Sequence, residues 1–186
     1  MTATKYIPRA DHVGSLLRPA SVVEARRKFF DDKIISLDEL TKVEDAAIID
    51  LVKMQESVGL NVVTDGEARR SFWHYDFMGQ LNGFDLEERD EGVQFSGVKL
   101  RPIFPTINGP LDFPDSHPMI EHFRYLASQS SVVPKISIPG PSCCHFRTDV
   151  NDIRHAPYKD IEVLMSDLIK TYKKAVQTFY DVGCRY

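Results

Sequence analysis

The feature of the sequence that most constrains the fold is a long helical pattern that ends directly before a β-type run. Ser36–Glu39 has the form of a capping box, in which the serine and the glutamate satisfy each other's backbone amides. Apolar residues recur behind it at helical spacing as far as Val58, and Gly59 supplies a stop. Residues 60–65 then read as a short strand. A helix that leads at once into a strand is typical of an α/β fold with parallel strands and crossover helices.

The rest of the chain repeats this alternation of helical and β-type patterns. Between about residues 78 and 114, glycines and prolines punctuate alternating apolar residues, which predicts a β-hairpin-rich insertion after the second strand, turning near residues 90–92. Outside the insertion, the patterns predict further helices over residues 20–30, 118–128 and 157–182, and further strands within residues 10–19, 132–138 and 184–186.

These elements account for only part of a complete α/β fold. The chain has 186 residues and ends within a predicted strand, whereas a complete (β/α)₈ barrel takes about 250 residues. Parallel strands are normally buried on both faces, so the last strand needs further chain beside it. No linker, repeat or low-complexity tract divides the sequence. We therefore expect residues 1–186 to form one partial domain, the front half of something longer.

The composition narrows the class of protein. The formal net charge of −4 argues against a nucleic-acid binder and against a polybasic membrane-surface protein. No apolar run approaches the roughly 18–20 residues of a membrane span, and the first residues lack the apolar region of a secretory signal. Three cysteines do not make a disulfide framework. We expect an acidic cytoplasmic protein whose partners are small molecules, either as a monomer or as a homo-oligomer.

Three predicted strand ends carry residues that could bind a ligand, because ligands of α/β folds sit at the carboxyl ends of parallel strands. In His12–Ser15, the backbone at Gly14 and the Ser15 hydroxyl could bind a carboxylate. In Thr64–Glu67, the glutamate could accept hydrogen bonds from an ammonium group. Together these two clamps would suit an α-amino acid. From spacing alone, the plainer interpretation of turn glycines and a solvated Glu67 is the more frequent one.

The third strand end, Pro139–His145, contains two adjacent cysteines and a histidine. Adjacent side chains rarely point at one ion, and common zinc pairs are separated by two to four residues, so packing or pocket lining is favoured over a metal role. Arg69–Arg70 and Trp73 could bind an anionic aromatic ligand or act as a loop latch. Cys184 is expected in the core. The remaining histidines are expected in surface or capping positions: His74, His117, His122 and His155.

Three segments taken together resemble the cobalamin-independent methionine synthase family, in particular its short single-barrel homologues. They are Arg9–Pro19, Val63–Arg70 and Ile138–Ser142, and they occur in the family's order over nearly the whole chain. The family's catalytic domain is a (β/α)₈ (TIM) barrel with an inserted β-hairpin region after the second strand. The resemblance implies that this chain is the first half of such a barrel, with its insertion at about residues 78–114.

The resemblance also implies an activity, which is methyl transfer from 5-methyltetrahydrofolate, as its polyglutamate, to homocysteine to give methionine. By analogy, Val13, Gly14 and Ser15 would hold the amino-acid carboxylate and Glu67 its ammonium group, and His12 is counted among the substrate-binding residues. Lys99 and Arg101 would lie near the folate. His145–Phe146 would border the pterin, near the point where full-length members place a tryptophan.

The implied reaction needs a group that residues 1–186 do not supply. In this family a zinc ion activates the thiol, and its His, Cys and carboxylate ligands come from the second half of the barrel. The resemblance therefore places the metal ligands downstream of Tyr186 and no catalytic residue within this chain. Two alternatives remain open at this point. One is a related transferase with another thiol acceptor or methyl donor, and the other is a non-catalytic half-barrel that dimerises or binds a small molecule.

Overall fold

The structure is a computed structural model that describes residues 10–90, 94–99 and 101–186. The chain divides into two compact units. Within the described ranges, the first unit comprises residues 10–70, 121–137 and 184–186, and the second comprises the rest. Each unit is described below by itself. The expectation of a single partial domain stays a prediction.

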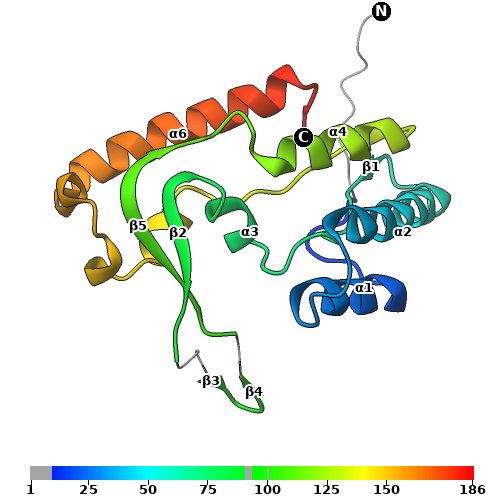
Figure 1. The fold of residues 1–186 in the computed structure, drawn as a ribbon. Helices are drawn as coiled ribbons and strands as arrows, with labels where there is room; N and C mark the ends of the chain where they lie inside the picture. Colours follow the sequence, from blue (N-terminus) through cyan, green and yellow to red (C-terminus); the bar gives the residue numbers. More distant parts are fainter. Residues whose placement is uncertain (1–9, 91–93, 100) are drawn as a thin grey trace, which may run out of the picture. The chain divides into compact units, whose positions relative to one another are not determined.

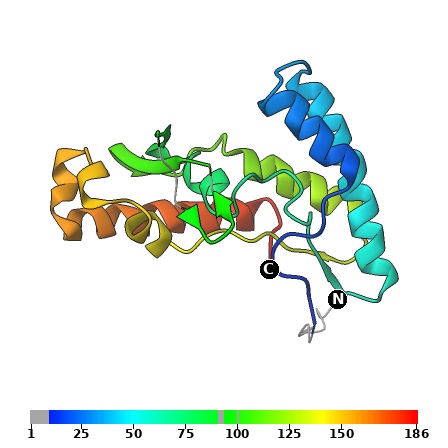
Figure 2. The ribbon, with the colours of Figure 1, turned by 90° about the horizontal axis from the view of Figure 1, so that it is seen from below.

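The first unit is built on a parallel pair of short strands. Strand β1 (Val62–Val63) pairs in parallel with β6 (Val133–Pro134), with Val62 opposite Val133. Helix α1 (Ala20–Phe30) packs along α2 (Leu37–Ser57), as Figure 2 shows. Most of α4 (Pro118–Gln129) also belongs to this unit. The core is made by buried side chains of α2, β1, the turn that follows β1, and α4: Ile48, Leu51, Val52, Val63, Ala68 and Leu126.

The predicted boundaries of α2 are confirmed at both ends. The Glu39 amide donates to Ser36 Oγ over 3.2 Å, and the Ser36 amide donates to Glu39 Oε2 over 2.8 Å, which completes the capping box. At the other end, Gly59 has a φ of +86°, the left-handed conformation that terminates helices. Helix α2 leads directly into β1, so the α/β joint predicted from this pattern is present.

Three of the strand predictions need correction. Residues 10–19 form no strand, because the segment is held by isolated contacts, such as the hydrogen bond from Leu16 N to Gly66 O, rather than by a ladder. The strand predicted over residues 132–138 has only two residues, and one of them, Pro134, lacks the N–H group that a longer ladder needs. Residues 184–186 are likewise not in a strand.

The second unit contains the predicted β-rich insertion. Strand β2 (Asn82–Glu88) pairs antiparallel with β5 (Ile103–Asp112), and the small pair of β3 (Gln94–Phe95) with β4 (Val98–Lys99) lies between them in the chain (Figure 1). At Gly83 a Cβ would lie 2.5 Å from the carbonyl oxygen of Gly109, so this crossing requires glycine. The turn predicted near residues 90–92 falls partly on residues outside the described ranges.

Helices complete the second unit: α3 (Tyr75–Met78), α5 (Ser142–Phe146), two 3₁₀ helices (Val150–Asp152 and Ala156–Lys159) and α6 (Ile161–Asp181). Pro157 lies in the second 3₁₀ helix, so the last long helix begins later than predicted. Its cap is Asp160, whose carboxylate accepts a hydrogen bond from the Glu162 amide over 2.9 Å. In Figure 1, α6 runs along β5, and Lys174 forms an ion pair with Asp112 over 2.9 Å.

Two histidines expected at the surface are buried in this unit. His117 stacks on Phe113, with ring centroids 4.7 Å apart, and its Nδ1 accepts a hydrogen bond from the Met119 amide. The capping role predicted for such a histidine is therefore confirmed for His117, but the surface location is wrong. His74 is also buried, among aromatic neighbours.

The sheets of the described residues are three separate two-stranded pairs, and over these residues the strands close no barrel. The α/β character therefore rests on the β1–β6 pair and the helices joined to it. Across residues 10–90, 94–99 and 101–186, no helix combines the length and apolarity needed to cross a membrane.

Candidate functional site

The first unit brings together the two segments predicted to clamp an α-amino acid. The segment that contains Ser15 lies against the turn that follows β1, where Leu16 N donates to Gly66 O over 3.0 Å. Ser15 Oγ lies 3.5 Å from the same carbonyl oxygen. A Cβ on Gly66 would approach the Leu16 side chain to 3.1 Å, so only glycine allows this close contact. The segments that carry the two predicted clamps are therefore neighbours in space, although Ser15 and Glu67 lie 52 positions apart in the chain.

Arg18 connects the same two segments through its guanidinium group. Its Nη2 donates to the carbonyl oxygens of Glu67 over 2.9 Å and of Arg70 over 2.6 Å. Its Nε donates to the carbonyl oxygen of Ala68 over 3.3 Å. The backbone of the turn at residues 66–70 is therefore bound to a side chain that lies three residues after Ser15.

Glu67 is buried and conformationally strained. Its side chain and backbone together are only 8% exposed, and its φ of +55° lies in the left-handed region that non-glycine residues rarely adopt. Its Oε1 accepts a hydrogen bond from Ser137 Oγ over 3.2 Å and lies 3.6 Å from an Arg70 guanidinium nitrogen. The interpretation of Glu67 as a solvated loop carboxylate is therefore wrong. Backbone strain of this kind is concentrated at functional sites.

Lys135 fixes the start of the segment that leads to Ser15. It follows β6, is 8% exposed, pairs with the carboxylate of Asp11 and donates to the carbonyl oxygen of His12 over 2.6 Å. The hydrogen bond from Lys135 lowers the pKa of Asp11. The Nε2 atom of His12 is buried and has no hydrogen-bond partner among the residues that the structure describes. A buried polar atom of this kind is available to a ligand beside the predicted carboxylate clamp.

Arg69 belongs to a latch of buried charges. It pairs with Asp45 and lies 3.3 Å from Glu44, and Glu44 in turn pairs with Arg26 over 2.7 Å. Arg26 also donates to the carbonyl oxygen of Arg69 over 2.7 Å. Of the two roles considered for Arg69, the structure supports the loop latch, because its charge is compensated by carboxylates of α2.

The residues predicted to contact a methyl donor all belong to the second unit. Arg101 is exposed, and the side chain of Lys99 in β4 lies outside the described set. His145 and Phe146 are exposed on α5, where Phe146 is 67% accessible. Arg101, His145 and Phe146 are therefore accessible to a ligand.

The two adjacent cysteines have different environments. Cys144 is fully buried with its Sγ 3.8 Å from the Tyr172 hydroxyl, and this burial raises the pKa of the thiol to about 12. Cys143 is only partly buried. Packing, the favoured role, fits Cys144. Cys184 is also partly exposed rather than in the core, because the segment after α6 has no strand partner.

His74 was not singled out as a site residue by its sequence pattern. It is 7% exposed, its Nδ1 has no hydrogen-bond partner within the described part of the chain, and its ring lies 4.6 Å from that of Trp73 and 4.0 Å from that of Tyr75. Burial first, and then the positive charge of Arg147, lowers the pKa of His74 to about 4. The neighbouring aromatic residues were the only sequence signal of this environment.

The described residues do not fit a zinc ion. Among them, no group of three or more His, Cys, Asp or Glu side chains is placed to hold a metal. The Cys143–His145 triplet supplies a buried, protonated Cys144 and an exposed His145, which do not converge. No step through a metal is therefore derived from these residues.

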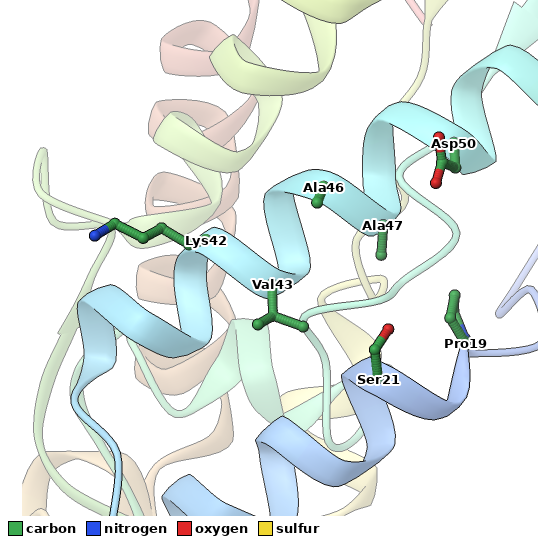
Figure 3. A pocket seen from close by; sticks show the side chains of 7 residues that line it. All are labelled: Pro19, Ser21, Lys42, Val43, Ala46, Ala47 and Asp50. Atoms are coloured by element: carbon green, nitrogen blue, oxygen red, sulfur yellow. The ribbon is translucent and has the colours of Figure 1, made fainter.

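A separate hollow of about 330 Å³ lies between α1 and α2 (Figure 3). Lys42 and Asp50 are the charged residues at its rim, and the rest of the lining is small or apolar. None of the residues predicted to bind substrate contributes to it. The candidate site is therefore the pair of segments around Ser15 and Glu67, not this hollow.

Comparison with known proteins agrees with a methionine-synthase-like α/β protein. Residues 8–177 match the family model described as the catalytic domain of cobalamin-independent synthases. The chain belongs to this family.

Two relatives match almost the whole chain. The uncharacterized protein YxjG of Bacillus subtilis is 40% identical over 180 residues, which cover 96% of this chain and 46% of that protein. A solved structure from Listeria monocytogenes, described as a candidate vitamin B12-independent methionine synthase, has a TM-score of 0.78 and 40% identity, covering 95% of this chain and 49% of that one. The chain therefore has the mixed α/β fold of this family and spans about half the length of these relatives.

The similarity to a named methyltransferase is weaker. The 5-methyltetrahydropteroyltriglutamate–homocysteine methyltransferase of Mycobacterium leprae is 28% identical over 130 residues, which cover 69% of this chain and 16% of that protein. Membership of the family therefore rests on the family model and on the two relatives that are 40% identical to this chain.

Proposed function

We propose that this chain forms the first half of a methionine-synthase-type barrel and binds the substrates of a methyl transfer from 5-methyltetrahydropteroylpolyglutamate to homocysteine. The observation that carries the proposal is the contact between the segment around Ser15 and the turn that holds Glu67. The 40% identity to a candidate methionine synthase supports the same activity.

In this proposal the first unit binds the amino acid. The Ser15 hydroxyl and the backbone at Gly14 donate to the carboxylate of homocysteine, and His12 Nε2 gains a polar partner in the complex. Glu67 accepts hydrogen bonds from the ammonium group, and such charge-assisted bonds are about twice as strong as neutral ones. Ser137 and Arg70 orient the Glu67 carboxylate for this contact.

The methyl donor is assigned to residues of the second unit. Lys99 and Arg101 would attract the anionic glutamate tail of the folate, and the exposed ring of Phe146 would contact the pterin. A zinc ion is proposed because the family uses one, and its ligands are expected outside the described residues.

The decisive experiment compares Glu67→Gln with the wild type in the complete protein. Loss of the charged acceptor is expected to weaken homocysteine binding about 10- to 100-fold, as measured by calorimetry. Glu121→Gln is the matched control, because Glu121 is an exposed residue of α4 that pairs with Arg124 across one helical turn. A wild-type protein that binds no homocysteine would contradict the proposal.

A second candidate is a related transferase for another thiol. The chain is 40% identical to YxjG and 28% identical to the named methyltransferase, and this difference favours the second candidate. Titration of the complete protein with homocysteine, cysteine and simple alkyl thiols distinguishes the two. The tightest binding by an acceptor that lacks the amino-acid group would favour the second candidate.

A further inference from the structure

Arg18 is the side chain that most directly controls where Glu67 lies relative to Ser15. Gly66 and Glu67 both have a positive φ, +65° and +55°, so the turn contains two consecutive left-handed residues. A non-glycine residue in this region is strained and persists only when its surroundings hold it in place. The Arg18 guanidinium provides that restraint by binding the carbonyl oxygens of three residues of the turn: Glu67, Ala68 and Arg70.

Hydrogen bonds within the turn, and one from Arg26 of α1 to the carbonyl oxygen of Arg69, also restrain it, but they do not reach the segment that contains Ser15. The Gly66 amide donates to Thr64 Oγ1 and the Glu67 amide donates to Asp65 Oδ1, both over 2.9 Å. These bonds shape the turn from within. Besides Arg18, the hydrogen bond from Leu16 N to Gly66 O and the 3.5 Å approach of Ser15 Oγ join the two segments, and both involve the carbonyl oxygen of Gly66, before Glu67.

We infer that Arg18 is a positioning residue, which sets the separation between the carboxylate clamp at Ser15 and the ammonium clamp at Glu67 so that one α-amino acid spans both. This inference rests on the proposed function and adds a determinant of its amino-acid specificity. Only two residues lie between Ser15 and Arg18, so a movement of the turn relative to Arg18 is also a movement relative to Ser15. Arg18 acts through backbone carbonyls and touches no substrate itself.

The geometry of the guanidinium group makes this role testable with a conservative change. Arginine presents its donors in a fixed planar fork, whereas lysine is a single flexible point of charge. Arg18→Lys therefore keeps the charge but cannot hold three carbonyl oxygens at once. If Arg18 supplied only positive charge, Arg18→Lys would bind homocysteine as the wild type does. If Arg18 positions the turn, Arg18→Lys would bind homocysteine more weakly.

The test measures homocysteine binding by calorimetry in the complete protein for four forms: wild type, Arg18→Lys, Glu67→Gln and the double variant. Arg18→Lys is expected to weaken binding about tenfold in the wild-type background and less than about twofold in the Glu67→Gln background, because positioning matters only while the carboxylate is present. The KM for the methyl donor should stay the same. Arg124→Lys, an exposed arginine of α4, is the matched control.

Each outcome decides the inference. Equal weakening by Arg18→Lys in both backgrounds, or a parallel rise in the KM for the methyl donor, would show general structural damage and overturn it. Unchanged binding in Arg18→Lys would also overturn it, while weakened binding in Glu67→Gln would leave the proposed function standing. A wild-type protein that binds no homocysteine would overturn both. Measuring the unfolding midpoint of each of the four forms shows whether a variant is less stable than the wild type.

Discussion

The turn at residues 66–70 and helix α5 both follow strands of the parallel pair, but they are stabilised very differently. The turn is buried, and its carbonyl oxygens are bound by arginine side chains. Helix α5 exposes His145 and Phe146 and buries only Cys144. The comparison contrasts a buried, hydrogen-bonded turn in the first unit with an accessible helix surface in the second. Under the proposed function, the amino acid is recognised by the buried turn and the methyl donor by the accessible surface.

The largest effect that tests this comparison is expected at Gly66. Gly66→Ala places a Cβ 3.1 Å from Leu16 and 3.2 Å from Leu51, at a φ of +65°, so strain and overpacking combine. We expect a loss of about 2–4 kcal/mol in the free energy of unfolding, measured by urea denaturation. Gly14→Ala is the control, because its φ is also positive but no atom lies within 4 Å of its Cβ. Equal losses in the two variants would mean that the turn is not tightly packed.

A smaller effect is expected from pH, through His74 near the positive charge of Arg147. The pKa of His74 is lowered from 6.5 to about 4 by burial, so below pH 6.5 the unfolded chain binds a proton that the folded chain excludes. The free energy of unfolding should therefore fall between pH 6.5 and pH 4, by about 1–3 kcal/mol in total.

The variant that checks this pH effect is His74→Phe, which removes the titrating ring and keeps the aromatic packing. Urea denaturation at several pH values should give a flatter profile for His74→Phe than for the wild type. His145→Gln, a change at an exposed residue of α5, is the matched control. A wild-type slope retained in His74→Phe would assign the pH dependence to other groups.

The smallest effect on stability is expected on α5 itself. Phe146→Ala removes a ring that is 67% exposed, so the free energy of unfolding should change by less than about 0.5 kcal/mol. If the pterin contacts this ring, the KM for the methyl donor should rise about 2- to 10-fold, with homocysteine binding unchanged. Val150→Ala, a similarly exposed residue of a 3₁₀ helix, should change neither quantity.

Local chemistry in the sequence was sufficient to predict the four longer helices, α1, α2, α4 and α6, and the insertion, but not the short helices α3 and α5. The Ser36–Glu39 capping box and Gly59 defined α2 at both ends, and the spacing of glycines and prolines indicated the β2–β5 hairpin. The strands were less predictable, because their length depends on partners elsewhere in the chain. Pro134 is an instance, since the apolar residues around it suggested a longer strand than its missing N–H group allows.

The candidate site was predictable in its residues but not in its environment. A glycine followed by an acidic residue after a strand drew attention to Glu67, yet its burial depends on Ser137 and Arg70. The role of Arg18 was not predicted either, because the carbonyl oxygens that it binds lie about 50 residues further along the chain. Long-range polar contacts of this kind leave no periodic signal in a single sequence.

The segment over residues 10–18 has one more consequence for how the protein folds. It has no regular secondary structure, and what holds it is chiefly one ion pair, a few hydrogen bonds and the partial burial of Leu16, while Leu17 is 94% exposed. We therefore expect this segment to dock only where β1, its turn and β6 are already in place, so that formation of the site is separable from formation of the helical core.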